Sequence, residues 1–432
     1  MASDHTLTYF PHQVVERSRL PQLAFIALLL LIFVGLNPFS PPPPVTQFGA
    51  AGASQGDIIR QILYLGTATL VALAALQRFG SGALRAVPIS MALLLAWCLA
   101  SALWAPVPGL VLRRAGLEVV IVVSLMLSVE TLGPARAFTL WRWLLAGVLL
   151  VNFLSIPLVA SARHGAGEID PALVGNWRGL YAHKNIAGAV SAITAILFLF
   201  TRTGWKNWIG MAIALASMIF LFMTHSKSSA GFLAIALLAG LCYRIAWRDG
   251  LSRAILAAII AVIVCAGIAF VLLDGDAIAK FLEDPDEFTG RAAIWAAELR
   301  YIADHPLLGA GFGTFTDAGI QSPLHNYAGA SWVDAVSHGH NGYLQVLVTI
   351  GGVGFVLAML AAVIAPLQRF WTLACPDGDG FKPLLMALFV FAILHNFMES
   401  DFLEGDAAVW VALLITIAAL NVGTRTNSLT RR

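Results

Sequence analysis

Long apolar runs recur along this chain, and they constrain its fold more than any other feature. Each has roughly the 20 mostly apolar residues that a helix needs to cross a bilayer. About twelve runs qualify: residues 20–36, 58–78, 87–104, 111–132, 137–160, 183–201, 206–224, 229–247, 253–273, 341–366, 382–398 and 405–422. Charged residues make up only 12% of the sequence, whereas soluble globular proteins carry about 25%. The sequence predicts an all-α integral membrane protein in which residues 1–432 form a single polytopic membrane domain.

The positions of lysine and arginine predict the direction in which the chain crosses the membrane. Basic residues accumulate on the cytoplasmic side. Placing the N-terminus inside puts most of them, including Arg17, Arg78, Arg85 and Arg425, on that side. Both termini are then cytoplasmic. Since topology accounts for the net charge of +2, that charge does not indicate a nucleic-acid partner.

Residues 274–340 form a long loop on the predicted outer, periplasmic side, and loops of this length are usually functional. Part of it, "GRAAIWAAELRYIADHP", has helical periodicity. The expected apolar side carries Ile294, Trp295, Leu299 and Ile302, and the polar side carries Arg291, Glu298 and Asp304. Such a short amphipathic helix would lie at the membrane surface or pack against the top of the bundle.

Ten basic residues fall on the predicted outer side, against the charge bias, and such charges are costly enough to suggest a task. They are Arg60, Arg113, Arg114, Arg163, Arg178, Lys184, Lys227, Lys280, Arg291 and Arg300. Several stand where helices begin, and helix N-termini also favour anions. As a group they predict an anion site at the outer membrane surface. Each one alone could instead bind a lipid headgroup or pair with an acidic residue.

The segment "VSHGHNGYLQ", residues 336–345, places His338, His340 and Asn341 directly before an apolar helix. An interfacial histidine is more often a packed residue than a catalytic one. The two histidines could also be half of a metal site completed by His305, His325 or the acidic run "EDPDE". No further ligand stands at a fixed helical spacing, so the metal hypothesis is the weaker one.

Three motifs resemble those of the O-antigen ligase family, within the wider superfamily of O-antigen ligases and polymerases. His340–Asn341, nine further residues and Gly351-x-x-Gly354 are similar to the ligase signature. The "GRAAIW…HPLLGAGFGTF" and "GLYAHKN" stretches are similar to other parts of the superfamily. The resemblance spans roughly residues 175–365. It implies a bacterial inner-membrane glycosyltransferase that moves a glycan from undecaprenyl diphosphate to a sugar hydroxyl of the lipid A core on the periplasmic side.

The resemblance also implies an inverting reaction without a metal or other cofactor, and the residues suit one. Fixed cations can stabilise a diphosphate leaving group, and a histidine can accept the proton of the attacking hydroxyl. At a helix N-terminus the dipole disfavours the imidazolium. We therefore expect His340 to be the general base, with His338 as its orienting neighbour or as the base itself.

The other candidate residues have binding or supporting roles. Arg178, Lys184 and Arg291 are the expected diphosphate binders, and Arg113 and Arg114 are weaker candidates. Asn341 would cap the helix or hold the imidazole. Gly351 and Gly354 would allow close helix packing.

Other functions of the same chain stay open at this stage. The runner-up is an O-antigen polymerase that uses the same lipid-linked donor, followed by a ligase that modifies proteins. A secondary transporter would also have about twelve helices, but transporters carry charges and broken helices near mid-membrane. Here the charges collect at the outer ends, and the apolar runs read as mostly uninterrupted.

Overall fold

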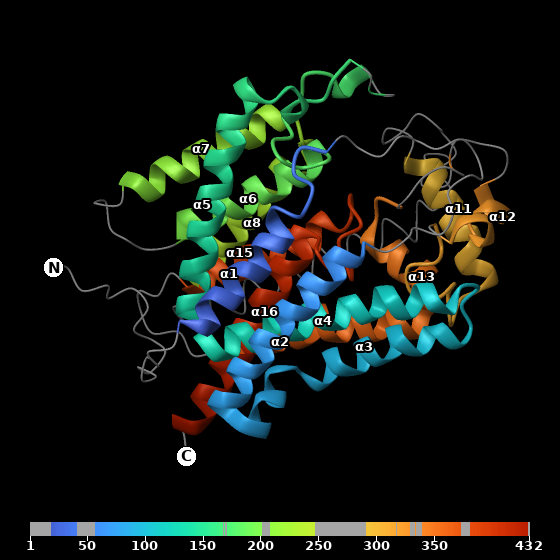
Figure 1. Cartoon of the computed structure of the whole chain (residues 1–432), viewed down its shortest axis with the longest axis horizontal. Coiled ribbons are helices and arrows are strands. Elements are labelled where there is room, and N and C mark those ends of the chain that lie inside the picture. The colour runs from blue at the N-terminus through green and yellow to red at the C-terminus, as the bar shows by residue number, and fades with distance from the viewer. Residues whose placement is uncertain are drawn as a thin grey trace.

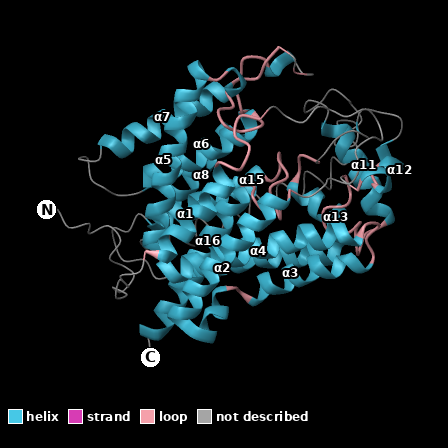
Figure 2. Ribbon diagram, viewed as in Figure 1, coloured by secondary structure: helices cyan, strands magenta, loops and turns pink. Residues whose placement is uncertain are grey.

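The computed structural model describes residues 19–40, 57–166, 168, 171–200, 208–246, 291–316, 318–328, 333, 339–372 and 381–430. These ranges contain helices and no β-strand (Figure 2). The α-helices are α1 Leu20–Phe33, α2 Ile58–Phe79, α3 Ile89–Ala100, α4 Pro108–Leu132, α5 Pro134–Leu158, α6 Lys184–Phe200, α7 Trp208–Thr224, α8 Lys227–Ala246, α11 Arg291–Asp304, α12 His325–Ala328, α13 Gly342–Met359, α14 Ala365–Thr372, α15 Phe381–His395 and α16 Ala408–Thr430.

The predicted all-α membrane class is confirmed. Within the described ranges, six helical segments are long and apolar enough to cross a membrane, and five shorter helices are also apolar. Each predicted apolar run lies on one of these helices except residues 253–273, which are outside the described part. The number of twelve crossings and the side on which the long loop lies stay predictions.

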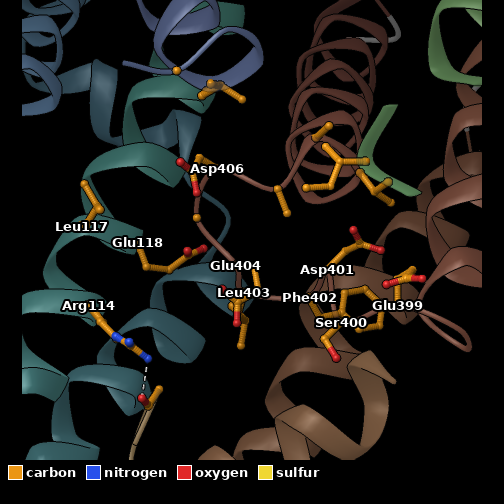
Figure 3. Close-up of a pocket in the computed structure, with 18 of the residues that line it drawn as sticks. Arg114, Leu117, Glu118, Glu399, Ser400, Asp401, Phe402, Leu403, Glu404 and Asp406 are labelled. Atoms are coloured by element: carbon orange, nitrogen blue, oxygen red, sulfur yellow. Dashed lines mark hydrogen bonds between the residues drawn. The ribbon is translucent and has the colours of Figure 1, made fainter. Parts of the chain in front are cut away.

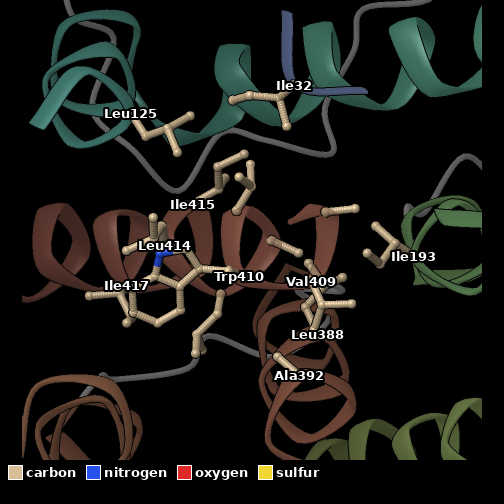
Figure 4. Close-up of a cluster of buried hydrophobic side chains, with 14 of the residues drawn as sticks. Ile32, Leu125, Ile193, Leu388, Ala392, Val409, Trp410, Leu414, Ile415 and Ile417 are labelled. Carbon is tan, nitrogen blue, oxygen red and sulfur yellow. The ribbon is translucent and has the colours of Figure 1, made fainter. Parts of the chain in front are cut away.

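Helix α16 runs through the middle of the bundle (Figure 1). It packs against α4, α15 and α6, and residues 409–420 are buried almost without exception. Figure 4 shows how Trp410 and Leu414 of α16 pack among side chains of the neighbouring helices. Because apolar side chains gain little by leaving lipid, such a centre is held mainly by close packing.

Two sets of polar contacts fix the direction of three helices. At one end, Arg60 of α2 forms an ion pair with Asp406, just before α16. At the other end, Arg425 of α16 contacts Glu130 of α4 and donates to the Arg85 carbonyl that follows α2. Helices α2, α4 and α16 therefore run the same way, as the predicted second, fourth and twelfth crossings should.

Helix α13 is broken at Gly351, whose φ of 68° is left-handed. The break frees carbonyl groups that the 306–311 segment then satisfies. Ala310 N donates to Val348 O and Gly311 N to Thr349 O, both at 2.8 Å. A Cβ on Gly351 would overlap the backbone of Leu307, so only glycine fits. The expectation of uninterrupted helices is wrong at this position.

Helix α11 packs against α13 and α12, which favours the bundle-top alternative for it. The expected division of its surface is wrong at two residues. Leu299 is exposed, whereas Glu298 is fully buried and its carboxyl oxygens have no hydrogen-bond partner. Burial raises the pKa of Glu298 to about 8. Glu298 lies against Gly339, where no side chain would fit.

Candidate functional site

The loop between α15 and α16 docks against the start of α13, and this contact builds the candidate site. Gly342 N donates to Asn396 O at 2.8 Å and to Glu399 O at 3.0 Å. Asn341 N donates to Ser400 Oγ at 3.1 Å. A Cβ on Gly342 would overlap the Asn396 side chain. Residues 339–342 and 396–402 therefore form one closely packed unit.

Glu399 joins three segments that are far apart in the sequence. Its Oε2 lies 3.2 Å from His340 Nδ1, and its Oε1 accepts from Arg291 Nη2 at 2.9 Å and from Asn185 Nδ2 at 2.6 Å. A second nitrogen of Arg291 donates to the Met398 carbonyl. The structure thus brings together the predicted base, one predicted diphosphate binder and the "GLYAHKN" segment.

The charges around Glu399 determine which atom of the Glu399–His340 pair donates the hydrogen bond. Burial acts to raise the pKa of Glu399, but the hydrogen bond from His340 and the charges of His340, Arg291 and His395 lower it well below its usual range. An ionised carboxylate only accepts hydrogen bonds, so His340 Nδ1–H must be the donor. With Nδ1–H held by Glu399, Nε2 is the ring nitrogen of His340 that could act as a general base.

A cavity of about 820 Å³ adjoins this group. Its wall includes Glu399 and the two arginines Arg113 and Arg114 of α4. His340 is not part of the wall, but it contacts the wall residue Glu399. Arg114 points toward the 306–316 segment and donates to Gly313 O at 2.5 Å (Figure 3). The weaker arginine candidates therefore lie on the cavity wall, next to the segment that resembles the superfamily.

The remaining predicted binders lie away from that wall. Arg178 is buried, and its Nη1 donates to Ser40 O at 3.0 Å and to Ala182 O at 2.8 Å. Lys184 is the first residue of α6, and its backbone N donates to His164 Nε2 at 3.1 Å. His338 lies outside the described residues. These contacts give Arg178 a structural task in holding the loop before α6.

The matching family model, described as O-Antigen ligase, covers residues 211–359. This part of the chain is therefore similar to the O-antigen ligase family. No curated protein matches it. The matched region includes α7, α8, α11 and α13, and with them Arg291, His340 and Gly351. Proteins of this family are glycosyltransferase-like enzymes, ligases or polymerases.

Three motif residues in the matched region have clear structural contacts. Asn341 is the N-cap of α13, and its Oδ1 accepts from Tyr343 N at 3.0 Å and Leu344 N at 3.1 Å. Gly351 admits the 306–311 segment rather than a second helix. Gly354 leaves room for the side chain of Ile350 one turn earlier. The role of the two glycines in close helix packing stays a prediction.

A second histidine–carboxylate pair occupies the same loop, and sequence reasoning missed it. His395 Nδ1 lies 2.6 Å from Asp401 Oδ2, and its Nε2 lies 3.2 Å from Ser229 Oγ. Glu399 was also missed, although the acidic residues after the eleventh run were visible as a group. In the described part of the chain, no three His, Cys, Asp or Glu residues cluster so that they could hold a metal.

Proposed function

We propose that this protein is an O-antigen ligase. It transfers a glycan from undecaprenyl diphosphate to a sugar hydroxyl of the lipid A core, with inversion and without a metal, on the periplasmic side of the bacterial inner membrane. The family match over residues 211–359 and the apolar helices support a membrane glycosyltransferase. The specific donor and acceptor rest on the motif resemblance and on the chemistry of the site.

In the proposed reaction, the acceptor hydroxyl oxygen attacks the anomeric carbon and its proton passes to His340 Nε2. The bond from that carbon to the phosphate oxygen breaks, and the electron pair leaves with the diphosphate. Arg291, Arg113 and Arg114 would stabilise the charge that develops there, with Lys184 and Arg178 as further candidates. His338 stays a candidate for the orienting neighbour or for the base.

The observation that carries this proposal is the position of Glu399. One carboxylate holds the Nδ1 side of His340 and the guanidinium of Arg291, so base and cation are fixed relative to each other. A carboxylate that orients a histidine and stabilises its protonated form is the arrangement used for hydroxyl activation in other enzymes. This arrangement supports chemistry at a hydroxyl group more than it supports transport.

Deletion of the gene followed by gel analysis of lipopolysaccharide tests the proposal. Loss of a ligase should leave lipid A core without any attached repeat. If the core instead carried one repeat, the protein would be a polymerase, and unchanged lipopolysaccharide with altered glycoproteins would indicate a protein-modifying ligase. With purified protein, loss of transfer on adding a chelator would overturn the metal-independent mechanism.

A further inference from the structure

The cavity beside Glu399 has more acidic than basic side chains in its wall, which is unexpected for a site that handles a diphosphate. Its lining includes three arginines, Arg60, Arg113 and Arg114. It also includes six carboxyl groups, those of Asp57, Glu118, Glu399, Asp401, Glu404 and Asp406. Most of the acidic groups come from the 399–406 loop, opposite α4. Two of the arginines, Arg113 and Arg114, lie on α4 and form the arginine-bearing part. The 399–406 loop forms the acidic part, which also holds Arg60 through its ion pair with Asp406.

Several of the acidic groups already have partners within the protein. Asp406 pairs with Arg60 at 2.6 Å, Asp401 with His395 at 2.6 Å, and Glu399 with His340 and Arg291. The Asp57 side chain accepts from Arg60 N at 3.0 Å. These contacts hold the loop in place and account for the presence of those carboxylates.

Glu118 is different, because half of its carboxyl group is left without a partner. The residue is only 1% exposed. Its Oε1 accepts a 2.7 Å hydrogen bond from Trp410 Nε1, while Oε2 has no partner. More than about 90% of buried polar groups in proteins are hydrogen-bonded. An unpaired carboxyl oxygen on a cavity wall therefore points to a group that is supplied from outside.

Glu118 reaches the cavity from the same helix as Arg113 and Arg114. Arg114 and Glu118 are one turn apart on α4, and the Glu118 carboxyl group points toward the loop that carries Glu404 (Figure 3). Gly405 of that loop lies behind Oε2, so that a Cβ there would be 3.1 Å from it. A side chain at Gly405 would therefore crowd the unpaired oxygen and the neighbouring Ile121.

We propose that the acidic part of the cavity is the acceptor subsite, and that Glu118 Oε2 accepts a hydrogen bond from a hydroxyl group of an uncharged sugar of the acceptor. This inference rests on the proposed function. A hydroxyl donor satisfies the carboxyl oxygen, whereas a phosphate or carboxylate on that sugar would be repelled by the surrounding acidic groups. The arginine-bearing part, one helical turn away, is left for the anionic donor.

The test uses the purified full-length chain in liposomes with a lipid-linked glycan as donor. The acceptor probe is lipid A core isolated from the deletion strain. Glu118→Gln keeps the size of the side chain and an oxygen for Trp410, but it replaces the second oxygen by an amide nitrogen that cannot accept. Losing a hydrogen bond in a buried site should raise the acceptor KM by about 10-fold, while the donor KM changes less than about twofold.

Two further variants distinguish binding from folding. Gly405→Ala changes no polar group, but its Cβ would crowd Glu118 Oε2. It should therefore also raise the acceptor KM. Ser128→Ala is the matched control, because Ser128 is a buried α4 residue whose hydroxyl also lacks a partner and which is not in the cavity wall. It should leave both KM values unchanged.

The outcomes separate this inference from the proposed function. If the wild-type protein transfers glycan and Glu118→Gln leaves the acceptor KM within twofold, the acceptor subsite is wrong and the ligase proposal stands. An equal rise in both KM values would also overturn it, since Glu118 would then support the whole cavity. If the wild-type protein transfers nothing to lipid A core, the proposed function fails, and the acceptor subsite fails with it.

Discussion

Two histidine–carboxylate pairs share the loop at 395–401, and they differ in what surrounds the imidazole. In the pair of His340 and Glu399, the histidine side chain is 26% exposed and its ring is held through Nδ1. In the pair of His395 and Asp401, the histidine is 2% exposed and contacts Asp401 and Ser229 through its two ring nitrogens. Both imidazole rings thus have a carboxylate partner, but the His340 ring is partly accessible and the His395 ring is enclosed.

The location of each pair complicates the choice between them. His395 is part of the wall of the 820 Å³ cavity, whereas His340 is not in that wall and contacts its residue Glu399. A base needs a ring nitrogen within reach of the substrate, and enclosure of His395 by Ser229 works against that. Accessibility therefore favours His340 as the base and gives His395 the task of holding the loop. The following predictions test this assignment.

The largest expected effect is the loss of transfer activity in His340→Ala. Removing a general base lowers a rate by about 100- to 10,000-fold, so transfer by the purified protein should fall by that factor while thermal unfolding changes little. His225→Ala is a suitable control, because His225 is an exposed residue that likewise has a positive φ. Transfer at the wild-type rate by His340→Ala would rule out the base assignment.

His395→Ala should act on stability instead. It leaves Asp401 largely buried without its partner, and breaking a buried ion pair costs about 3 kcal/mol or more. We expect a lower unfolding temperature in detergent, with transfer per folded molecule retained within a few fold. Adding Asp401→Asn should recover part of the stability because it removes the unpaired charge. If His395→Ala unfolded normally but could not transfer, the roles of the two histidines would be reversed.

Lowering the pH should destabilise the protein through His183 before it breaks the pair of His340 and Glu399. Burial and the charge of His164 lower the pKa of His183 to about 4, from about 6.5 in the unfolded chain. As pH falls from 6.5 to 4, the unfolded state takes up a proton that the folded state does not. The free energy of unfolding should therefore drop by about 3 kcal/mol in this range.

His183→Asn should remove most of that acid-dependent loss, whereas His225→Asn should not. The Glu399 pair does not contribute in this range, because its carboxylate has a lowered pKa. The stability that the Glu399 carboxylate contributes is present above the pKa of about 4.3 that a glutamate has in the unfolded chain. It is lost only as the pH falls further, toward the lowered pKa of the folded state. Equal acid sensitivity of His183→Asn and the wild-type protein, measured by chemical unfolding, would contradict the prediction.

The helices were predictable from the sequence, but the site was only partly so. Apolar runs of bilayer length show where α2 or α16 lies because a helix must satisfy its own backbone. The role of Glu399 depends on contacts with residues 59, 108 and 214 positions away, and no local pattern records such contacts. Periodicity likewise placed Glu298 on a solvated side, although tertiary packing buries it under Gly339.

Glu399→Gln should have a smaller effect than loss of His340. The glutamine can still accept from Arg291, but it no longer holds the imidazole with a negative charge. We expect kcat to fall by about 10-fold and the pH dependence of kcat to shift, with KM values nearly unchanged. A purely structural Glu399 would lower stability without moving the pH profile, and recovery of that profile by Glu399→Asp would support a positioning role.

The smallest effect should come from Asn341, which is next to His340 but contacts the backbone. Asn341→Ala removes the cap of α13 and should cost about 1 kcal/mol of stability, while Asn341→Ser, which can still cap, should lose little. If Asn341 only caps the helix, transfer per folded molecule should be normal in both variants. Its Nδ2 also donates to Phe397 O at 3.3 Å. A serine variant with restored stability but low transfer would therefore show that this bond to the loop helps to orient His340.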